Sequence, residues 1–187
     1  MRKTLFKNLV SRPVSEPPPV LDDAEVSALA EKLEHTSRAR LGRSLAIRMV
    51  DAGSCNACEL EINALNNPVY ALDRFGINFV ASPRHADILL VTGPMTKAMR
   101  EALERTYQAM PAPKWVISAG VCAHNGGLFA GSYACVDGGV AAVVPVDLHI
   151  AGCPPNPTEL LRGLLTLLSA TMLRQSERLP VIEVTDP

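Results

Sequence analysis

Four of the five cysteines in this chain are placed so that they could bind a metal centre. Cys55 and Cys58 form a Cys-x-x-Cys pair, and Cys122 and Cys153 follow singly, far along the chain. Four thiolates suit Zn²⁺ or an iron–sulfur cluster, because soft sulfur ligands select those centres. Structural zinc sites usually have two close pairs, so one pair joined by two single cysteines favours a cluster. A thioredoxin-like Cys-x-x-Cys is the other alternative, although it leaves Cys122 and Cys153 unused.

The residues beside the two single cysteines also favour a cluster. Gly120, Gly126 and Gly127 surround Cys122, so the backbone can approach closely and point its amides at sulfur. Cys153 is followed by Pro154-Pro155, whose fixed φ angles stiffen that loop. Glycine and proline are common in ordinary turns, but a cysteine inside both loops indicates a site.

The fifth cysteine, Cys135, lies within residues 131–135, away from any predicted strand end. We interpret it as a small buried or partly buried residue and not as a ligand, which is the commoner fate of a single cysteine.

Two acidic residues, Glu59 and Glu61, follow the Cys-x-x-Cys pair directly. A carboxylate at this position could relay protons, since proton transfer needs a titratable group within hydrogen-bond reach. The alternative is a structural role, because acids are favoured in the first turn of a helix.

Strands alternate with helices along most of the chain. This alternation predicts an α/β fold, an open parallel sheet with helices on both faces. Apolar runs and helical periodicity predict strands over 44–50, 77–81, 87–92, 114–118 and 147–151, and helices over 22–41, 59–66, 95–110 and 157–174. The four candidate ligands follow the first, fourth and fifth strands, and in parallel sheets sites gather at the carboxyl ends of the strands.

Composition narrows the function classes. The 187 residues are 48% apolar, which is enough for a full core, and the net charge of -1 with only 4% aromatic residues gives no support for a nucleic-acid partner. We find no stretch of the ~20 apolar residues that a spanning helix needs and no secretory signal, so we expect a reducing cytoplasm. Residues 1–43 are interpreted as a proline-rich extension and a helix that dock on partners, and residues 44–187 as the cluster-binding domain.

Taken together, these segments resemble the cluster-bearing small subunits of membrane-bound group 4 [NiFe] hydrogenases, of the formate hydrogenlyase or hydrogenase-4 type. They also resemble a relative of those proteins, the 20-kDa-type (B) subunit of respiratory complex I. The resemblance covers roughly residues 44 to 175. It rests on Ser54-Cys55-Asn56-Ala57-Cys58-Glu59, Ser82-Pro83-Arg84-His85-Ala86-Asp87, Val91-Thr92-Gly93-Pro94, Pro113-Lys114-Trp115-Val116-Ile117-Ser118, Cys122 with Gly126-Gly127, and Gly152-Cys153-Pro154-Pro155-Asn156-Pro157.

The resemblance implies a flavodoxin-like fold and one [4Fe–4S] cluster held by Cys55, Cys58, Cys122 and Cys153. It implies a hydrogenase large subunit with a Ni–Fe centre, a ferredoxin-like iron–sulfur subunit and membrane subunits as partners, on the cytoplasmic side of the inner membrane. The spaced Cys55–Cys58 pair resembles the hydrogenase branch, because complex I subunits of this type carry two adjacent cysteines. The same subunit in a complex-I-like or nickel-free complex is the alternative. The chain alone is expected to be inactive.

Overall fold

The computed structural model describes residues 23–176 of the chain. The proline-rich extension predicted within residues 1–21 lies outside the described residues. Within them, five strands form one sheet in the order β2-β1-β3-β4-β5, and every neighbouring pair is parallel. The strands are β1 (Leu45–Asp51), β2 (Ile77–Phe79), β3 (Ile88–Thr92), β4 (Trp115–Ala119) and β5 (Leu148–Ile150). This strand order is the flavodoxin-like one, so the predicted fold class is confirmed.

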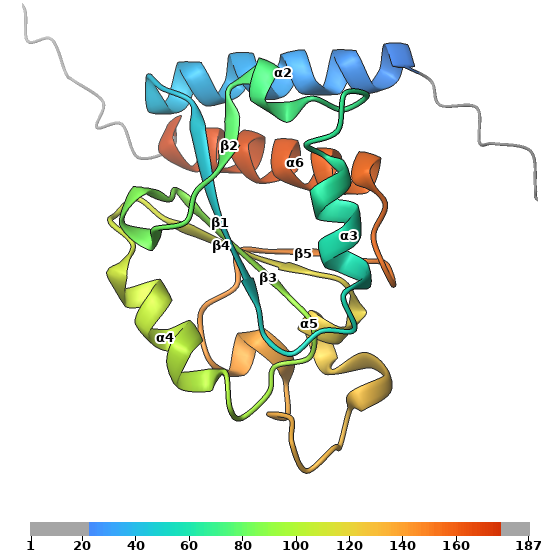
Figure 1. Cartoon of the computed structure of the whole chain (residues 1–187). Helices are drawn as coiled ribbons and strands as arrows, with labels where there is room; N and C mark the ends of the chain where they lie inside the picture. The colour runs from blue at the N-terminus through green and yellow to red at the C-terminus, as the bar shows by residue number, and fades with distance from the viewer. Residues whose placement is uncertain (1–22, 177–187) are drawn as a thin grey trace, which may run out of the picture.

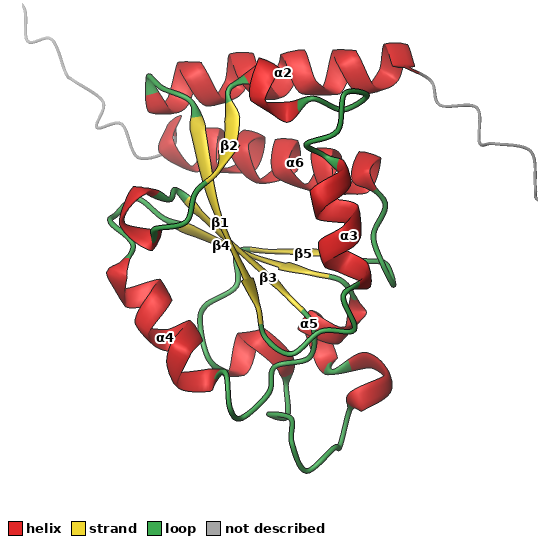
Figure 2. Ribbon diagram, in the orientation of Figure 1, coloured by secondary structure: helices red, strands yellow, loops and turns green. Residues whose placement is uncertain are grey.

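Helices cover both faces of the sheet (Figures 1 and 2). Three helices pack on one face: α2 (Asp23–Leu41), α3 (Ala57–Ala64) and α6 (Pro157–Ser176). The other face is covered by α4 (Arg100–Ala109), by the short α5 (Val121–Asn125) and by a helical turn at Gly139–Ala142. Figure 1 shows α2 lying along α6, farther from the sheet.

The central strands are buried on both faces, as their nearly continuous apolar sequence predicts. In β3 all five residues are buried, and alternate side chains enter opposite cores. Ile88 and Leu90 pack with α2, α3 and α6, whereas Leu89 and Val91 pack with α4. This alternation follows from the two-residue period of a strand, and it fixes the register of the sheet between the two helical layers.

Two predicted helices, α3 and α4, begin at other residues than predicted, and the α-helix α5 was not predicted. The helix α3 begins at Ala57 and not at Glu59, so Cys58 lies in its first turn and not in the preceding loop. The helix α4 begins at Arg100 and not at Met95. The segment after β3 is instead held by the loop that carries Cys135: the Val136 amide donates to the Met95 carbonyl at 2.7 Å, and Thr96 pairs with Cys135 in an isolated bridge. The short α5 holds Cys122.

The amino ends of the strands are closed by acids that bond to backbone. Asp87, which is 3% exposed, accepts hydrogen bonds from the Arg43 guanidinium at 2.6 and 3.0 Å and from the Ala46 amide at 2.9 Å. Asp147 accepts a hydrogen bond from the Val116 amide at 2.8 Å. These contacts join the starts of β1, β3, β4 and β5, away from the cysteines.

None of the helices over residues 23–176 combines the length and the apolar character needed to cross a bilayer.

Candidate metal centre

The loop after β1 is shaped by Asp51, the last residue of that strand. Its Oδ1 accepts hydrogen bonds from the amides of Gly53 and Ser54, both at 2.7 Å, and the Ser54 hydroxyl then accepts one from the Asn56 amide at 3.0 Å. Such short-range side-chain contacts favour tight turns over a continued strand. Cys55 is left exposed at the turn, and Cys58 is buried in the first turn of α3.

The loops after β4 and β5 are tied together by backbone hydrogen bonds. The Gly120 amide donates to the Ile150 carbonyl at 2.8 Å, and the Val121 amide donates to the Gly152 carbonyl at 2.9 Å. Cys122 and Cys153 therefore follow two strands whose ends are held in register. Cys122 is half-buried and Cys153 is exposed.

The loop that carries Cys153 is anchored at the start of α6 by a capping box. The Asn156 side chain accepts a hydrogen bond from the Glu159 amide at 2.8 Å, and the Glu159 carboxylate accepts one from the Asn156 amide at 2.9 Å. This reciprocal pair satisfies two amides at the helix terminus and fixes the direction in which the chain enters α6.

Two glycines leave space beside the sulfur atoms, which is the strongest sign that these residues fit a cluster. A Cβ on Gly120 would lie 2.8 Å from the Cys58 sulfur and 3.5 Å from the Gly152 carbonyl oxygen. A Cβ on Gly127 would lie 2.8 Å from the Cys122 sulfur. Both glycines have positive φ, at 87° and 50°, a conformation that L residues rarely adopt. The loops after β1, β4 and β5 thus come together at the Cys58 sulfur, where Gly120 has no side chain to crowd it.

The thiols are close enough to influence one another's ionisation. Burial raises the pKa of Cys58 to about 11, and the Glu59 carboxylate and the thiolates of Cys122, Cys55 and Cys153 act in the same direction. Burial also raises the pKa of Cys122, followed by the effect of Cys153, while a hydrogen bond from the Leu128 amide opposes the rise. The predicted ligands are therefore brought to one edge of the sheet, and a bound cation would stabilise their thiolates.

Among residues 23–176, no three His, Cys, Asp or Glu side chains lie in an arrangement that would hold a single metal ion.

The two acids singled out beside the cysteines differ in their surroundings. Glu59 is 5% exposed, and neither of its carboxylate oxygens has a hydrogen-bond partner among the described residues. Glu61 is only partly buried. A relay role for either acid stays a prediction, but the burial of Glu59 was not foreseen, because helical periodicity alone does not show which neighbour covers a short helix.

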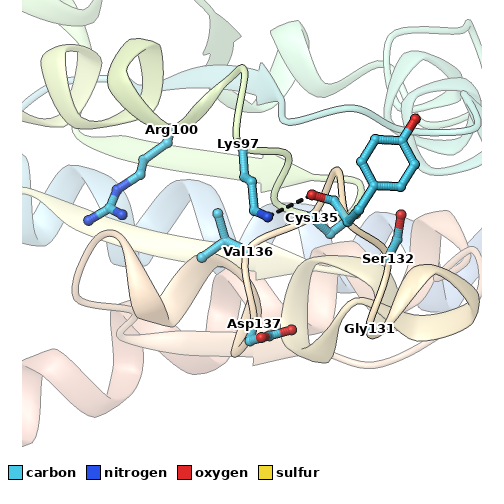
Figure 3. Close-up of a pocket in the computed structure, with 8 residues that line it drawn as sticks. Lys97, Arg100, Gly131, Ser132, Cys135, Val136 and Asp137 are labelled. Atoms are coloured by element: carbon cyan, nitrogen blue, oxygen red, sulfur yellow. Dashed lines mark hydrogen bonds between the residues drawn. The ribbon is translucent and has the colours of Figure 1, made fainter.

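Cys135 is buried, at 7% exposure, as the sequence indicated. It lines a separate pocket of about 480 Å³ with Lys97, Arg100, Gly131, Ser132, Tyr133, Val136 and Asp137. Figure 3 shows this pocket, with the Lys97 amine donating to the Tyr133 carbonyl at 2.6 Å. Thr96 connects this pocket to the loop that carries Cys55. Its backbone pairs with Cys135 in the isolated bridge, and its methyl group lies 2.4 Å from where a Cβ on Gly53 would be.

Two histidines form a pair that sequence reasoning missed. The rings of His124 and His149 stack with centroids 4.1 Å apart, and His149 Nδ1 lies 3.1 Å from the carbonyl oxygen of Ser118. Burial lowers the pKa of His149, the His124 charge adds to this, and the Ser118 carbonyl opposes it. His124 lies in α5, after β4, and His149 lies within β5, so no spacing in the sequence could have revealed the contact. Asp51 was missed too, although its Asp-x-Gly-Ser pattern is a local turn signal.

Comparison with known proteins identifies the family to which this arrangement belongs. Residues 55–167, from the first cysteine of the pair to the middle of α6, match the model of the family described as NADH ubiquinone oxidoreductase, 20 Kd subunit. The chain belongs to this family. The matched segment includes all four predicted ligands.

Two relatives are a formate hydrogenlyase subunit and a probable membrane-bound hydrogenase subunit. The chain is 46% identical over 146 residues to formate hydrogenlyase subunit 7 of Escherichia coli, covering 78% of this chain and 55% of that protein. It is 43% identical over 128 residues to the probable membrane-bound hydrogenase subunit mbhJ of Pyrococcus furiosus, covering 68% of this chain and 76% of the relative. The chain thus spans about half the length of the formate hydrogenlyase subunit.

A solved structure shares the fold. A chain in the membrane-bound sulfane sulfur reductase, an archaeal respiratory membrane complex, superposes with a TM-score of 0.62 at 31% identity. The match covers 79% of this chain and 77% of that one. This protein is therefore a hydrogenase-type or complex-I-like subunit of the 20-kDa family, whose members belong to oxidoreductase complexes.

Proposed function

We propose that this chain is the electron-transfer subunit of a membrane-bound, energy-converting [NiFe] hydrogenase. In this proposal Cys55, Cys58, Cys122 and Cys153 hold one [4Fe–4S] cluster beside the Ni–Fe centre of a partner large subunit. The observation that carries the proposal is the space that Gly120 and Gly127 leave at the sulfur atoms of Cys58 and Cys122. A cluster of this kind supplies one-electron transfer when it is bound.

The geometry supports a role for each of several residues of this chain. The four cysteine thiols would bind the cluster. The Leu128 amide donates toward the Cys122 sulfur, and the turn formed by Asp51 orients the exposed Cys55. Amides that point at sulfur favour the more negative, reduced state and so tune the potential. The proposed partners are a hydrogenase large subunit, a ferredoxin-like iron–sulfur subunit and membrane subunits. The subunit would lie peripherally, on the cytoplasmic side of the inner membrane.

Glu59 is the better of the two proposed proton-relay residues. Its buried carboxylate has no partner among the described residues, so both oxygens are available to a neighbouring group. The test replaces Glu59 and, separately, Glu61 with glutamine in the whole complex. Hydrogen turnover that is unchanged in both variants would exclude a relay through either residue.

The cluster itself is tested by anaerobic purification of the chain with its complex. We expect brown protein with about four irons per chain and a paramagnetic signal on reduction. Cys122→Ser should lose the iron, and Cys135→Ser, as the matched control, should keep it. Colourless protein with one zinc would defeat the proposal, and iron loss in Cys135→Ser would show that the ligand set is wrong.

A second candidate is the same subunit in a nickel-free, complex-I-like oxidoreductase. The family description and the shared fold with the sulfane sulfur reductase chain support it. The spaced Cys55–Cys58 pair, which resembles the hydrogenase branch, favours nickel. Nickel analysis of the purified complex, together with hydrogen turnover, separates the two candidates.

A further inference from the structure

The outer edge of β1 is left without a strand partner over half its length. The strand β2 pairs only with Leu45 to Ile47, and the last contact on this side is the Val80 amide donating to the Ile47 carbonyl at 2.8 Å. On its other side β1 stays paired with β3 as far as Asp51. In the described part of the chain, residues 48–51 therefore have a strand on one side only.

The alternation of a parallel ladder shows which backbone groups this leaves open. Ala46 bonds toward β3, where its carbonyl accepts from the Asp87 amide, and Ile47 bonds toward β2. Successive residues of a strand point their amide and carbonyl groups to opposite sides. Met49 and Asp51 therefore direct theirs outward, to the side that β2 does not reach, and such an edge is a template for another strand.

A groove runs beside this edge, between the end of β2 and α3. Its volume is about 230 Å³, and it is lined by Arg48, Met49, Ile62, Asn63, Asn66, Phe79, Val80 and Ala81. Half-buried Met49, Phe79 and Val80 give it an apolar floor. Exposed Asn63, on α3, and exposed Asn66, in the turn after that helix, offer amide donors and acceptors.

Arg48 is the single charged residue in this lining, and the described part of the chain does not neutralise it. Its Nε is buried and has no hydrogen-bond partner, and Arg48 takes part in none of the ion pairs among the described residues. The two acids of α3, Glu59 and Glu61, form none of the ion pairs among the described residues, and the Glu59 oxygens also lack hydrogen-bond partners there. A buried cationic donor without an acceptor is costly, so a carboxylate placed here would be favoured.

We propose that this groove binds an extended acidic segment of another protein. Its main chain would continue the sheet beyond β2 through Met49 and Asp51, its carboxylate would pair with the Arg48 guanidinium, and an apolar side chain would rest on Met49 and Phe79. Addition of a strand to an exposed edge, with side-chain pockets giving specificity, is an established mode of peptide recognition. None of the four proposed cluster ligands lines this groove.

The first test places a photo-crosslinking phenylalanine derivative at Asn66 in the intact complex. The matched control carries the same residue at Gln108, which is exposed on α4, across the sheet. We expect irradiation to join Asn66 to a partner peptide that contains Asp or Glu, and mass spectrometry to locate the crosslink beside that acid. Crosslinking at Asn66 no stronger than at Gln108, or to lipid or to peptides without an acid, would overturn the proposal.

The second test changes the charge. Arg48→Glu should weaken binding of the partner that crosslinking identifies at least tenfold, and Arg48→Lys should retain most of that binding. Replacing the partner's acid with arginine should restore binding to the Arg48→Glu chain. Failure of that exchange would reject the charge pairing, and Arg48→Met serves as the reduced-charge variant if Arg48→Glu accumulates poorly. Iron content should not change in any of these variants, so loss of the partner is distinguishable from failure of the cluster.

Discussion

Asp87 and Glu59 are buried to a similar extent, at 3% and 5% exposure, yet they lie at opposite ends of the sheet in opposite states. At the amino end Asp87 accepts three hydrogen bonds, two of them from Arg43. At the carboxyl end Glu59 accepts none from the described residues. The amino end has its polar groups satisfied internally, whereas the carboxyl end holds polar groups and thiols that are free to bind something else.

The glycines beside the sulfur atoms give the largest expected effect. Gly120→Ala should abolish most iron binding, because the added Cβ would lie 2.8 Å from the Cys58 sulfur. Gly131→Ala is the matched control: Gly131 also has positive φ, at 74°, but nothing lies within 4 Å of its added Cβ. Iron analysis of both purified variants separates the effect of crowding the Cys58 sulfur from the effect of straining the backbone at a positive φ. Equal iron in the two would mean that the space at Cys58 is not needed.

Substitution at the amino ends of the strands should lower stability and not iron binding. Asp87→Ala removes three hydrogen bonds to a buried carboxylate and should lower the free energy of unfolding by about 2–3 kcal/mol. Chemical denaturation of the cluster-free chain measures this. The iron bound per folded molecule should stay the same, and a variant that loses iron while remaining folded would break the contrast between the two ends.

The Asp51 turn should affect the cluster without much effect on the fold. Asp51→Ala removes the acceptor for the amides of Gly53 and Ser54, worth roughly 1 kcal/mol each, and should release iron to a chelator several times faster. Asp51→Asn keeps a carbonyl oxygen at the same place and should release iron nearly as slowly as the unaltered protein. Equal release rates for the alanine and asparagine variants would remove Asp51 from the site.

In the cluster-free chain, Cys58 should make the free energy of unfolding depend on pH in the alkaline range. Its pKa is raised from 9.0 to about 11, mainly by burial, so between these values the folded state holds a proton that the unfolded state has lost. The contribution to stability is therefore present below pH 9 and is lost as the pH rises toward 11. Urea midpoints measured across this window should fall, and Cys58→Ala should show a smaller fall.

The surface ion pairs of α4 should matter least. Arg100 Nε lies 3.1 Å from the Glu104 carboxylate, one turn away, and both side chains are exposed. Arg100→Ala should change the free energy of unfolding by no more than about 0.5 kcal/mol, because exposed pairs are screened by water. A loss comparable with that of Asp87→Ala would show that α4 has a role that its exposure does not suggest.

The sequence by itself determined the α/β class, the five strands and the edge at which four cysteines gather. Those features rest on local patterns: the continuous apolar run of β3, the proline that begins α6, and cysteines placed directly after strands. Strands that are apolar on both faces, in alternation with helices along the chain, form a parallel sheet with helices on both faces. The glycines on either side of Cys122 also indicated a close approach of the backbone to sulfur.

Only the tertiary structure decided the features that depend on distant neighbours. The segment from Met95 is drawn into contact with the Cys135 loop, so α4 starts at Arg100 although the local sequence favours an earlier start. The burial of Glu59, the stacking of His124 on His149, and the groove beside Arg48 arise where separate segments meet. The physical reason is that local preferences specify which segments become helix or strand, whereas the packing of one segment on another determines which polar groups find partners and which are left free.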